Sequence, residues 1–130
     1  MVIGALEIEV IVAWSESLKD KRRVIRSLKD RLHREHMVSV SEIGEQDSLR
    51  RARIGVVCVG ADGRRVGETL DRVARKVTQL RDAEVGILAR EVFRAADVPA
   101  DRRTGTDQGL EEDLLTRGQA ALETDPEGTP

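Results

Sequence analysis

Apolar residues recur at two different spacings along most of the chain, and the order in which these spacings occur predicts the secondary structure. A period of two is typical of a strand with one buried face, and spacings of three and four residues are typical of an amphipathic helix. The period of two is clearest at Leu6, Ile8, Val10 and Val12. The predicted order is a strand over residues 2–14, a helix over 17–35, a strand over 38–44, a strand over 53–60, a helix over 63–80 and a strand over 85–91.

Both helices carry a start signal and an apolar stripe. Ser17 followed by Asp20 resembles a capping box, and Asp62 is placed to cap the second helix. The stripe of the first helix consists of Leu18, Val24, Ile25, Leu28 and Leu32, and that of the second of Val66, Leu70, Val73 and Val77. Each helix is therefore expected to pack one face against a sheet.

The order β-α-β-β-α-β predicts a ferredoxin-like α+β fold, a two-layer sandwich with an antiparallel sheet of order 4-1-3-2. The strands over residues 2–14 and 53–60 are the most apolar, which suits the two central positions. The strand over 38–44 is rich in serine and is expected at an edge. Residues 1–93 are thus predicted to form one domain.

The composition changes in the last part of the chain, over residues 94–130. The three prolines and four of the eleven glycines lie there, and the segment carries nine acidic residues and four arginines, a net charge of −5. Residues 1–93 carry +3 by the same count. We expect 94–130 to be an acidic and largely disordered tail attached to a mildly basic domain.

Cysteine content and hydropathy restrict the compartment. A single cysteine, Cys58, rules out an intramolecular disulfide and fits a reducing environment. The first residues include two glutamates, and no apolar run has the length of a membrane span. We therefore expect a cytoplasmic protein without a membrane partner.

The first predicted helix is strongly basic. Over residues 18–36 it has eight basic residues and three acidic ones, a net charge of +5. Such a row suits the phosphate backbone of a nucleic acid. The nucleic-acid-binding residues predicted from this basic helix are Lys19, Lys21, Arg22, Arg23 and Arg26, of which Lys19, Arg22 and Arg26 share one face by their spacing. The alternative is a solvated outer face whose acids pair with neighbouring bases.

The sheet face that points away from the helices offers a second surface. RNA-recognition domains of similar topology stack bases on aromatic residues there, but the strand over 53–60 has no aromatic residue and Trp14 stands alone. RNA recognition on that face is therefore not expected. Ile11 with Val57 or Val59 predicts a small apolar patch, through which, or through an edge strand, a homodimer would form.

No group of residues predicts catalysis or cofactor binding. Glu42, Gln46 and Asp47 cluster at a strand end, and without a nucleophile or histidine beside them we expect a partner-binding loop rather than a catalytic one. His33 and His36 have a spacing that can hold a metal, but no third ligand is evident. The expectation is a non-enzyme with no metal, no cofactor and no small-molecule substrate.

Two ordered segments carry a family resemblance. The first is Ser17-Leu18-Lys19-Asp20-Lys21-Arg22 with Val24 and Arg26-Ser27-Leu28, and the second is Val38-Ser39-Val40-Ser41-Glu42-Ile43-Gly44-Glu45-Gln46-Asp47 with Arg51-Ala52. Together they resemble the YlxP-like family of small bacterial proteins, a domain of unknown function. The resemblance covers about residues 2–92 and implies a ferredoxin-like fold and an association with translation. The chain departs from the family pattern at Glu45 and Ser48, where an aromatic residue or histidine is frequent, and in its acidic tail.

These observations lead to one functional hypothesis and one alternative. We expect a non-catalytic accessory protein that binds ribosomal RNA or a ribosomal subunit through the basic first helix. The alternative is a protein-interaction module that dimerises through the open sheet face or an edge strand.

Overall fold

The computed structural model of the chain describes residues 1–99. The elements are β1 (Val2–Ile11), α1 (Leu18–His36), β2 (Ser39–Gly44), β3 (Arg51–Gly60), α2 (Gly63–Thr78), β4 (Glu84–Arg94) and a short 3-10 helix (Ala95–Asp97). Residues Met1–Ala96 form one compact unit. The predicted tail, residues 94–130, begins at the last residue of β4. Only its residues 94–99 lie in the described part of the chain.

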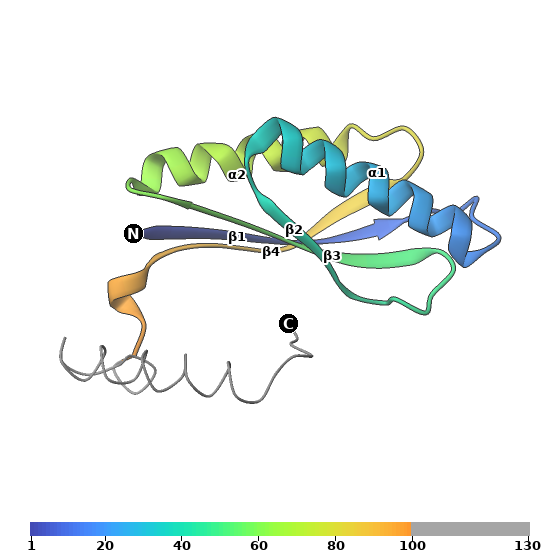
Figure 1. The fold of residues 1–130 in the computed structure, drawn as a ribbon, viewed down its shortest axis with the longest axis horizontal. Coiled ribbons are helices and arrows are strands. Elements are labelled where there is room, and N and C mark those ends of the chain that lie inside the picture. The colour runs from blue at the N-terminus through green and yellow to red at the C-terminus, as the bar shows by residue number, and fades with distance from the viewer. Residues whose placement is uncertain (100–130) are drawn as a thin grey trace, which may run out of the picture. The chain divides into compact units, whose positions relative to one another are not determined.

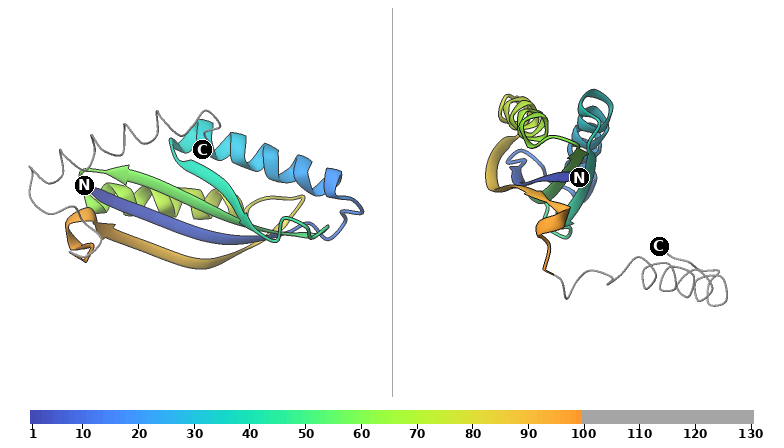
Figure 2. Two further views of the ribbon diagram at one scale, coloured as in Figure 1. Left: turned by 60° about the horizontal axis from the view of Figure 1, so that its bottom comes forward. Right: turned by 90° about the vertical axis from the view of Figure 1, so that its left-hand side faces the viewer.

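The four strands form one sheet in the order β2-β3-β1-β4, and every neighbouring pair is antiparallel. Helices α1 and α2 cover the same face of this sheet (Figure 1; Figure 2). This is the predicted ferredoxin-like α+β sandwich with order 4-1-3-2, so the prediction of fold is confirmed. The serine-rich β2 is an edge strand, as expected, and β4 is the other edge.

The core lies between the sheet and the helices because the alternation in β1 places one set of side chains there. Leu6, Ile8, Val10 and Val12 are at most 2% exposed. Antiparallel pairing aligns the first three of these residues with Val56, Ile54 and Ala52 of β3. Directly paired residues point to the same face of a sheet, so the β3 residues are buried as well. The helices complete the core with their apolar stripes: Val24, Ile25, Leu28 and Leu32 on α1, and Val66, Leu70, Val73 and Val77 on α2.

Both predicted helix caps are present. The hydroxyl of Ser17 accepts a hydrogen bond from the backbone N–H of Asp20 (3.1 Å), and the Asp20 carboxylate in return accepts from the N–H of Glu16. Asp62 accepts from the N–H of Arg64 at 2.8 Å. These bonds satisfy N–H groups that the first turn of a helix leaves without a partner.

Two glycines allow α2 to lie close against the sheet. A Cβ atom on Gly4 of β1 would lie 2.5 Å from Cγ1 of Val66, and one on Gly60 would lie 2.8 Å from Cγ2 of the same side chain. Both distances are shorter than a carbon–carbon contact permits. The first turn of α2 therefore depends on the absence of a side chain at both positions.

Strand β1 ends at Ile11, earlier than predicted, because the chain turns after it. The backbone N–H of Val12 donates to the carbonyl oxygen of Arg50 (2.8 Å), and that of Ser15 donates to the carbonyl oxygen of Val12 (3.0 Å). Ser15 is fully buried in this turn. The turn lies at the same end of the sheet as the loop over residues 45–50, which precedes β3.

The open sheet face differs from the expectation in the position of its apolar patch. Ile11 pairs with Arg51, whereas Val57 and Val59 pair with Ala5 and Ile3 at the other end of β1. At about 3.4 Å per residue, Ile11 and Val57 are roughly 20 Å apart along the strands, so the predicted patch with Ile11 is wrong. The patch that forms instead contains Ile3, Val57, Val59 and Phe93. Phe93 lies on β4 and pairs with Ile3 of β1.

Two ion pairs occupy the Ile11 end of the open face. Arg51 lies 3.9 Å from Glu9, and Arg53 lies 3.8 Å from Glu7. Glu7 and Glu9, which point away from the helices on β1, thus have arginine partners on β3. The face is divided into a charged end and an apolar end.

Candidate functional site: the basic face of the helices and the lysine beneath it

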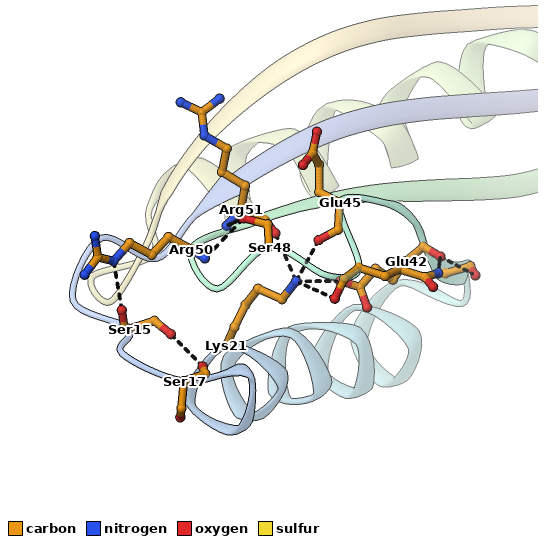
Figure 3. Close-up of polar contacts among 10 residues, drawn as sticks. Ser15, Ser17, Lys21, Glu42, Glu45, Ser48, Arg50 and Arg51 are labelled. Carbon is orange, nitrogen blue, oxygen red and sulfur yellow. Dashed lines mark hydrogen bonds and ion pairs between the residues drawn. The ribbon is translucent and has the colours of Figure 1, made fainter.

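Lys21 does not belong to the exposed basic row to which the prediction from sequence assigned it. Its side chain is fully buried on the inner face of α1. The ammonium Nζ donates to the carbonyl oxygens of Glu45 (2.8 Å), Arg51 (3.1 Å) and Gln46 (3.3 Å), and lies 3.5 Å from Oε2 of Glu42 (Figure 3). We name these five residues the lysine junction. Because its three protons already have acceptors, Lys21 is not available to a phosphate, and its predicted role in binding nucleic acid is wrong.

The helical position of Lys21 explains its burial. It precedes Val24 and Ile25 by three and four residues, and so continues the apolar stripe of α1 toward its first turn. A buried ammonium without partners would be strongly unfavourable, and the carbonyl groups of the loop supply them. This spacing was a signal in the sequence that the prediction overlooked.

The loop residues predicted to bind a partner have different positions. Glu42 faces the helical layer, because its partner Ile54 is a core residue, and its carboxylate is directed to Lys21. Gln46 and Asp47 are exposed. The side chain of Gln46 donates to the carbonyl oxygen of Glu42 (3.3 Å) and so spans the base of the loop. Glu42 therefore has a structural role as the ion-pair partner of Lys21, whereas the side chains of Gln46 and Asp47 lie on the surface.

A second set of bonds ties the same loop to the turn after β1. Nε of Arg50 donates to the carbonyl oxygen of Ser15 (2.9 Å), and the Ser15 hydroxyl donates to that of Ser17 (2.9 Å), as Figure 3 shows. Glu45 adopts a left-handed conformation with φ of 61°, which directs its carbonyl group to Lys21. The start of α1 and the 45–50 loop are therefore held as one unit.

The remaining basic residues of α1 lie outward. Five are exposed and two are half-buried, and none makes an ion pair with a carboxylate of residues 1–99. We call these seven residues the basic face: Lys19, Arg22, Arg23, Arg26, Lys29, Arg31 and Arg34. Local pairing with the acids of the helix, the alternative considered from the sequence, is not observed in this part of the chain.

Two shallow depressions meet at Arg31. The first, of about 380 Å³, lies along α1 and is lined by Arg23, Arg26, Ser27, Asp30, Arg31 and Arg34. The second, of about 350 Å³, lies between α1 and the end of α2 and is lined by Arg31, Lys76, Gln79, Leu80, Arg81 and Asp82. Arg31 lines both, so the basic surface continues from the first helix to the loop after the second. The prediction from sequence stopped at Arg26 and missed Arg31 and Arg34, although their spacing from Arg23 and Arg26 follows the helical period.

The two helices are joined at this point by an ion pair. Nζ of Lys76 lies 2.9 Å from Oε2 of Glu35, which places the last turns of α1 and α2 against each other (Figure 1). The hydrogen bond from Lys76 lowers the pKa of the Glu35 carboxyl, and the nearby charges of Lys76, His36 and Arg31 act in the same direction. Glu35 therefore stays ionised and neutralises Lys76, leaving Arg31 and Arg81 as the cations of the second depression.

The second helix adds to the charge of the same layer. Residues 63–78 contain five basic and two acidic residues, a net charge of +3. Arg64 pairs with Glu68 (3.2 Å), and Asp71 pairs with Arg90 of β4 (3.2 Å). The basic surface predicted from the sequence was confined to α1, whereas the fold brings both helices to one side of the molecule.

His33 has a local structural partner, and Cys58 is buried in the core. Nδ1 of His33 lies 2.9 Å from the carbonyl oxygen of Val38, beyond the end of α1. Burial raises the pKa of the Cys58 thiol, which lies in β3. Residues 1–99 contain no cluster of three or more side chains of the types that bind metals. No helix in the same range is both long enough and apolar enough to span a membrane.

Comparison with known proteins identifies the family. Residues 3–89 match the model of the family described as a protein of unknown function, DUF503. The chain belongs to this family. It is 33% identical over 92 residues to the uncharacterized protein YlxP of Bacillus subtilis (strain 168), a match that covers 71% of this chain and all of that protein. The YlxP-like resemblance drawn from the two sequence segments is therefore confirmed.

A structural comparison finds a more distant likeness. A C-terminal segment of the alpha subunit of aIF2 from Pyrococcus abyssi matches with a TM-score of 0.46 and 20% identity. The match covers 70% of this chain and 51% of that chain, so this protein spans about half of the structure it resembles.

The two segments that carry the family resemblance meet in space at the lysine junction. The first contributes the start of α1 with Lys21, and the second contributes Glu42, Glu45 and Gln46. The resemblance therefore rests on residues that build the fold at this end of the sheet. The basic face lies on the opposite side of the same helix.

Proposed function

We propose that this member of the DUF503 family is a non-catalytic accessory protein that binds RNA through the basic face of α1. The observation that carries the proposal is that all seven outward cations of the helix lack an ion-pair partner among residues 1–99. Unpaired cations on a rigid helix are suited to phosphate groups, whose neutralisation releases bound counterions and favours binding. The absence of local pairing among residues 1–99 leaves these cations available to a ligand.

The target of the proposal is ribosomal RNA or a ribosomal subunit. The association with translation that the family resemblance implies directs this choice. The loop carboxylate that would be the first candidate for a general base, Glu42, is directed to a buried lysine. That engagement supports a structural role for the loop rather than a catalytic one.

A sedimentation experiment tests the target. The tagged protein, in a lysate centrifuged through a sucrose gradient, is expected to migrate with a ribosomal subunit at low salt and to leave it as salt increases. Recovery at the top of the gradient at every salt concentration would contradict a ribosomal target. Binding to naked ribosomal RNA is then measured with the purified protein, with DNA of equal length as the comparison; tighter binding of DNA would contradict RNA as the ligand.

Charge reversal tests the surface. The double substitution Arg22→Glu with Arg26→Glu is expected to weaken RNA binding by about tenfold or more for each arginine that touches a phosphate. It also lowers the slope of log K against log salt by about 0.7 for each phosphate that is no longer neutralised. The single substitution Arg26→Glu has a matched control in Arg94→Glu, which changes the net charge equally but lies at the end of β4. Equal weakening by these two single substitutions would show that net charge alone, and not this helix, determines binding.

A second candidate function is a protein-interaction module that forms a homodimer. It is favoured by the apolar patch on the open sheet face, where Val59 is 66% exposed, Val57 42% and Phe93 36%. Contiguous exposed apolar side chains of this kind mark contact surfaces. The substitution Val57→Asp is expected to convert a dimer to a monomer, which light scattering detects as half the mass.

A further inference from the structure

The aromatic residues of this chain lie outside its core. The sequence contains one tryptophan, one phenylalanine and no tyrosine. Trp14 is 51% exposed and Phe93 is 36% exposed, although tryptophan is usually buried in large part. A half-exposed indole in a chain with an aliphatic core points to a contact that Trp14 makes with another molecule.

The structure fixes the position of the Trp14 ring. Trp14 lies in the turn between β1 and α1, and its indole N–H donates to the carbonyl oxygen of Asp82 at 2.8 Å. This bond crosses to the loop between α2 and β4, 68 residues further along the chain. The polar atom of the side chain is thus satisfied, and the ring offers its apolar surface. A side chain held in advance loses little conformational entropy when a ligand binds.

The same bond joins Trp14 to a loop that borders the basic surface. Asp82, which accepts the indole hydrogen bond, lines the depression that also contains Arg31 and Arg81. Arg31 also lines the depression along α1, together with Arg23 and Arg26. Trp14 is therefore bonded to a loop that borders the depression of Arg31 and Arg81, two arginines with no carboxylate partner within residues 1–99.

We propose that Trp14 is the stacking platform for an unpaired base of a single-stranded RNA segment, whose phosphates follow Arg81, Arg31 and Arg26. This inference rests on the proposed function, RNA binding by α1, and names the class of RNA. Proteins that bind single strands combine a positively charged path for the backbone with aromatic rings on which bases stack. In a duplex the bases are stacked on each other and are not accessible to Trp14.

The side chains around the second depression fit this assignment. Gln79, an exposed residue at the end of α2, also lines it and provides an amide that can donate to and accept from a base edge. Leu80 adds an apolar surface. Stacking requires no particular base, because every base has an aromatic face. The site is therefore expected to accept different sequences with modest preferences.

Trp14 is the only tryptophan, so its fluorescence reports on the site directly. The purified full chain is titrated at low salt with an adenosine oligonucleotide of about eight residues, a length within the usual range for such sites. A hairpin duplex with the same number of phosphates is titrated in parallel. We expect the single strand to quench the fluorescence and to bind more tightly than the hairpin.

Substitutions separate stacking from charge. Trp14→Ala is expected to weaken binding of the single strand by about 5- to 100-fold, with little effect on the hairpin. Trp14→Phe keeps an aromatic face without the N–H and is expected to retain most of the affinity. Leu88→Ala, which removes an exposed apolar side chain of β4, is the control and should leave the affinity unchanged. If Trp14→Ala fails to fold, Trp14→Phe and the fluorescence of the unsubstituted protein decide.

The outcomes distinguish this inference from the proposed function. Equal affinity for the hairpin and the single strand, without a change in fluorescence, would overturn the stacking role while RNA binding by α1 stands. No binding of either oligonucleotide at low salt would overturn RNA binding itself. Quenching by the single strand that Arg31→Glu weakens together with affinity would support the whole path from Trp14 to α1.

Discussion

The two sides of α1 carry the same kind of charge with opposite consequences. On the inner side, Lys21 is fully buried and its ammonium is bound by three carbonyl groups and a carboxylate. On the outer side, seven cations of the basic face have no ion-pair partner among residues 1–99. Lys19 and Lys21 are only two positions apart, which on a helix directs them to different sides.

The comparison shows that the number of charges on a helix does not by itself indicate a binding surface. A buried ammonium is tolerated only when its hydrogen bonds are complete, and then it stabilises the arrangement that completes them. An exposed cation contributes little to folding and remains available to a ligand. The two sides are therefore expected to respond differently to substitution.

The largest effect is expected at Lys21. Replacing it by methionine in Lys21→Met leaves Glu42 without its ion-pair partner and three carbonyl groups without their donor, and is expected to lower the free energy of unfolding by about 3–5 kcal/mol. Lys19→Met, the matched control on the outer side, should change it by less than about 0.5 kcal/mol. Urea unfolding monitored by circular dichroism measures both. Similar values for the two variants would show that the lysine junction is not what holds the loop.

An intermediate effect is expected at Glu42. The substitution Glu42→Gln keeps the shape of the side chain but removes the charge that faces the Lys21 ammonium. Because the Glu42 side chain is 21% exposed, water partly compensates, and a loss of about 1 kcal/mol is expected. In the background of Lys21→Met the same substitution should cost less, and the difference measures the coupling of the pair. Purely additive losses would mean that the two side chains act independently.

The smallest effect is expected at the exposed ion pair of Glu35 with Lys76. The pKa of Glu35 is lowered in the folded state, chiefly by the hydrogen bond from Lys76. The pair therefore stabilises the fold fully above the ordinary glutamate value of 4.5, and the contribution is lost as the pH falls through the lowered value. Thermal unfolding of Glu35→Gln should differ slightly from that of the unsubstituted protein at neutral pH and not at all in acid. A difference that grows in acid would contradict this sign.

Much of the fold could be predicted from local patterns. The period of two at Leu6, Ile8 and Val10 predicted a central strand, and Ser17 and Asp62 predicted where the helices begin. These features depend on residues close together in the chain, for which sequence spacing and spatial proximity agree. The contacts of Gly4 and Gly60 with Val66 could not be predicted in this way, because they depend on how closely α2 approaches the sheet.

The candidate site was predicted only in part. Lys19, Arg22, Arg23 and Arg26 are exposed as expected, whereas the hydrogen-bond acceptors of Lys21 lie 24 to 30 residues further along the chain. The patch assigned to Ile11 and Val57 failed for a related reason. Strand register places the two residues at opposite ends of the sheet, and the pattern of each strand alone contains no information about register.

The sequence by itself determined the order of the elements, the apolar stripe of each helix and the excess of positive charge on α1. The tertiary structure decided which cation is structural, that α2 extends the basic surface, and that Trp14 is hydrogen-bonded to the loop that contains Arg81. The physical reason is that secondary structure follows from periodicity over a few neighbouring residues. The role of a charged or aromatic side chain depends on partners that only folding brings within hydrogen-bond distance.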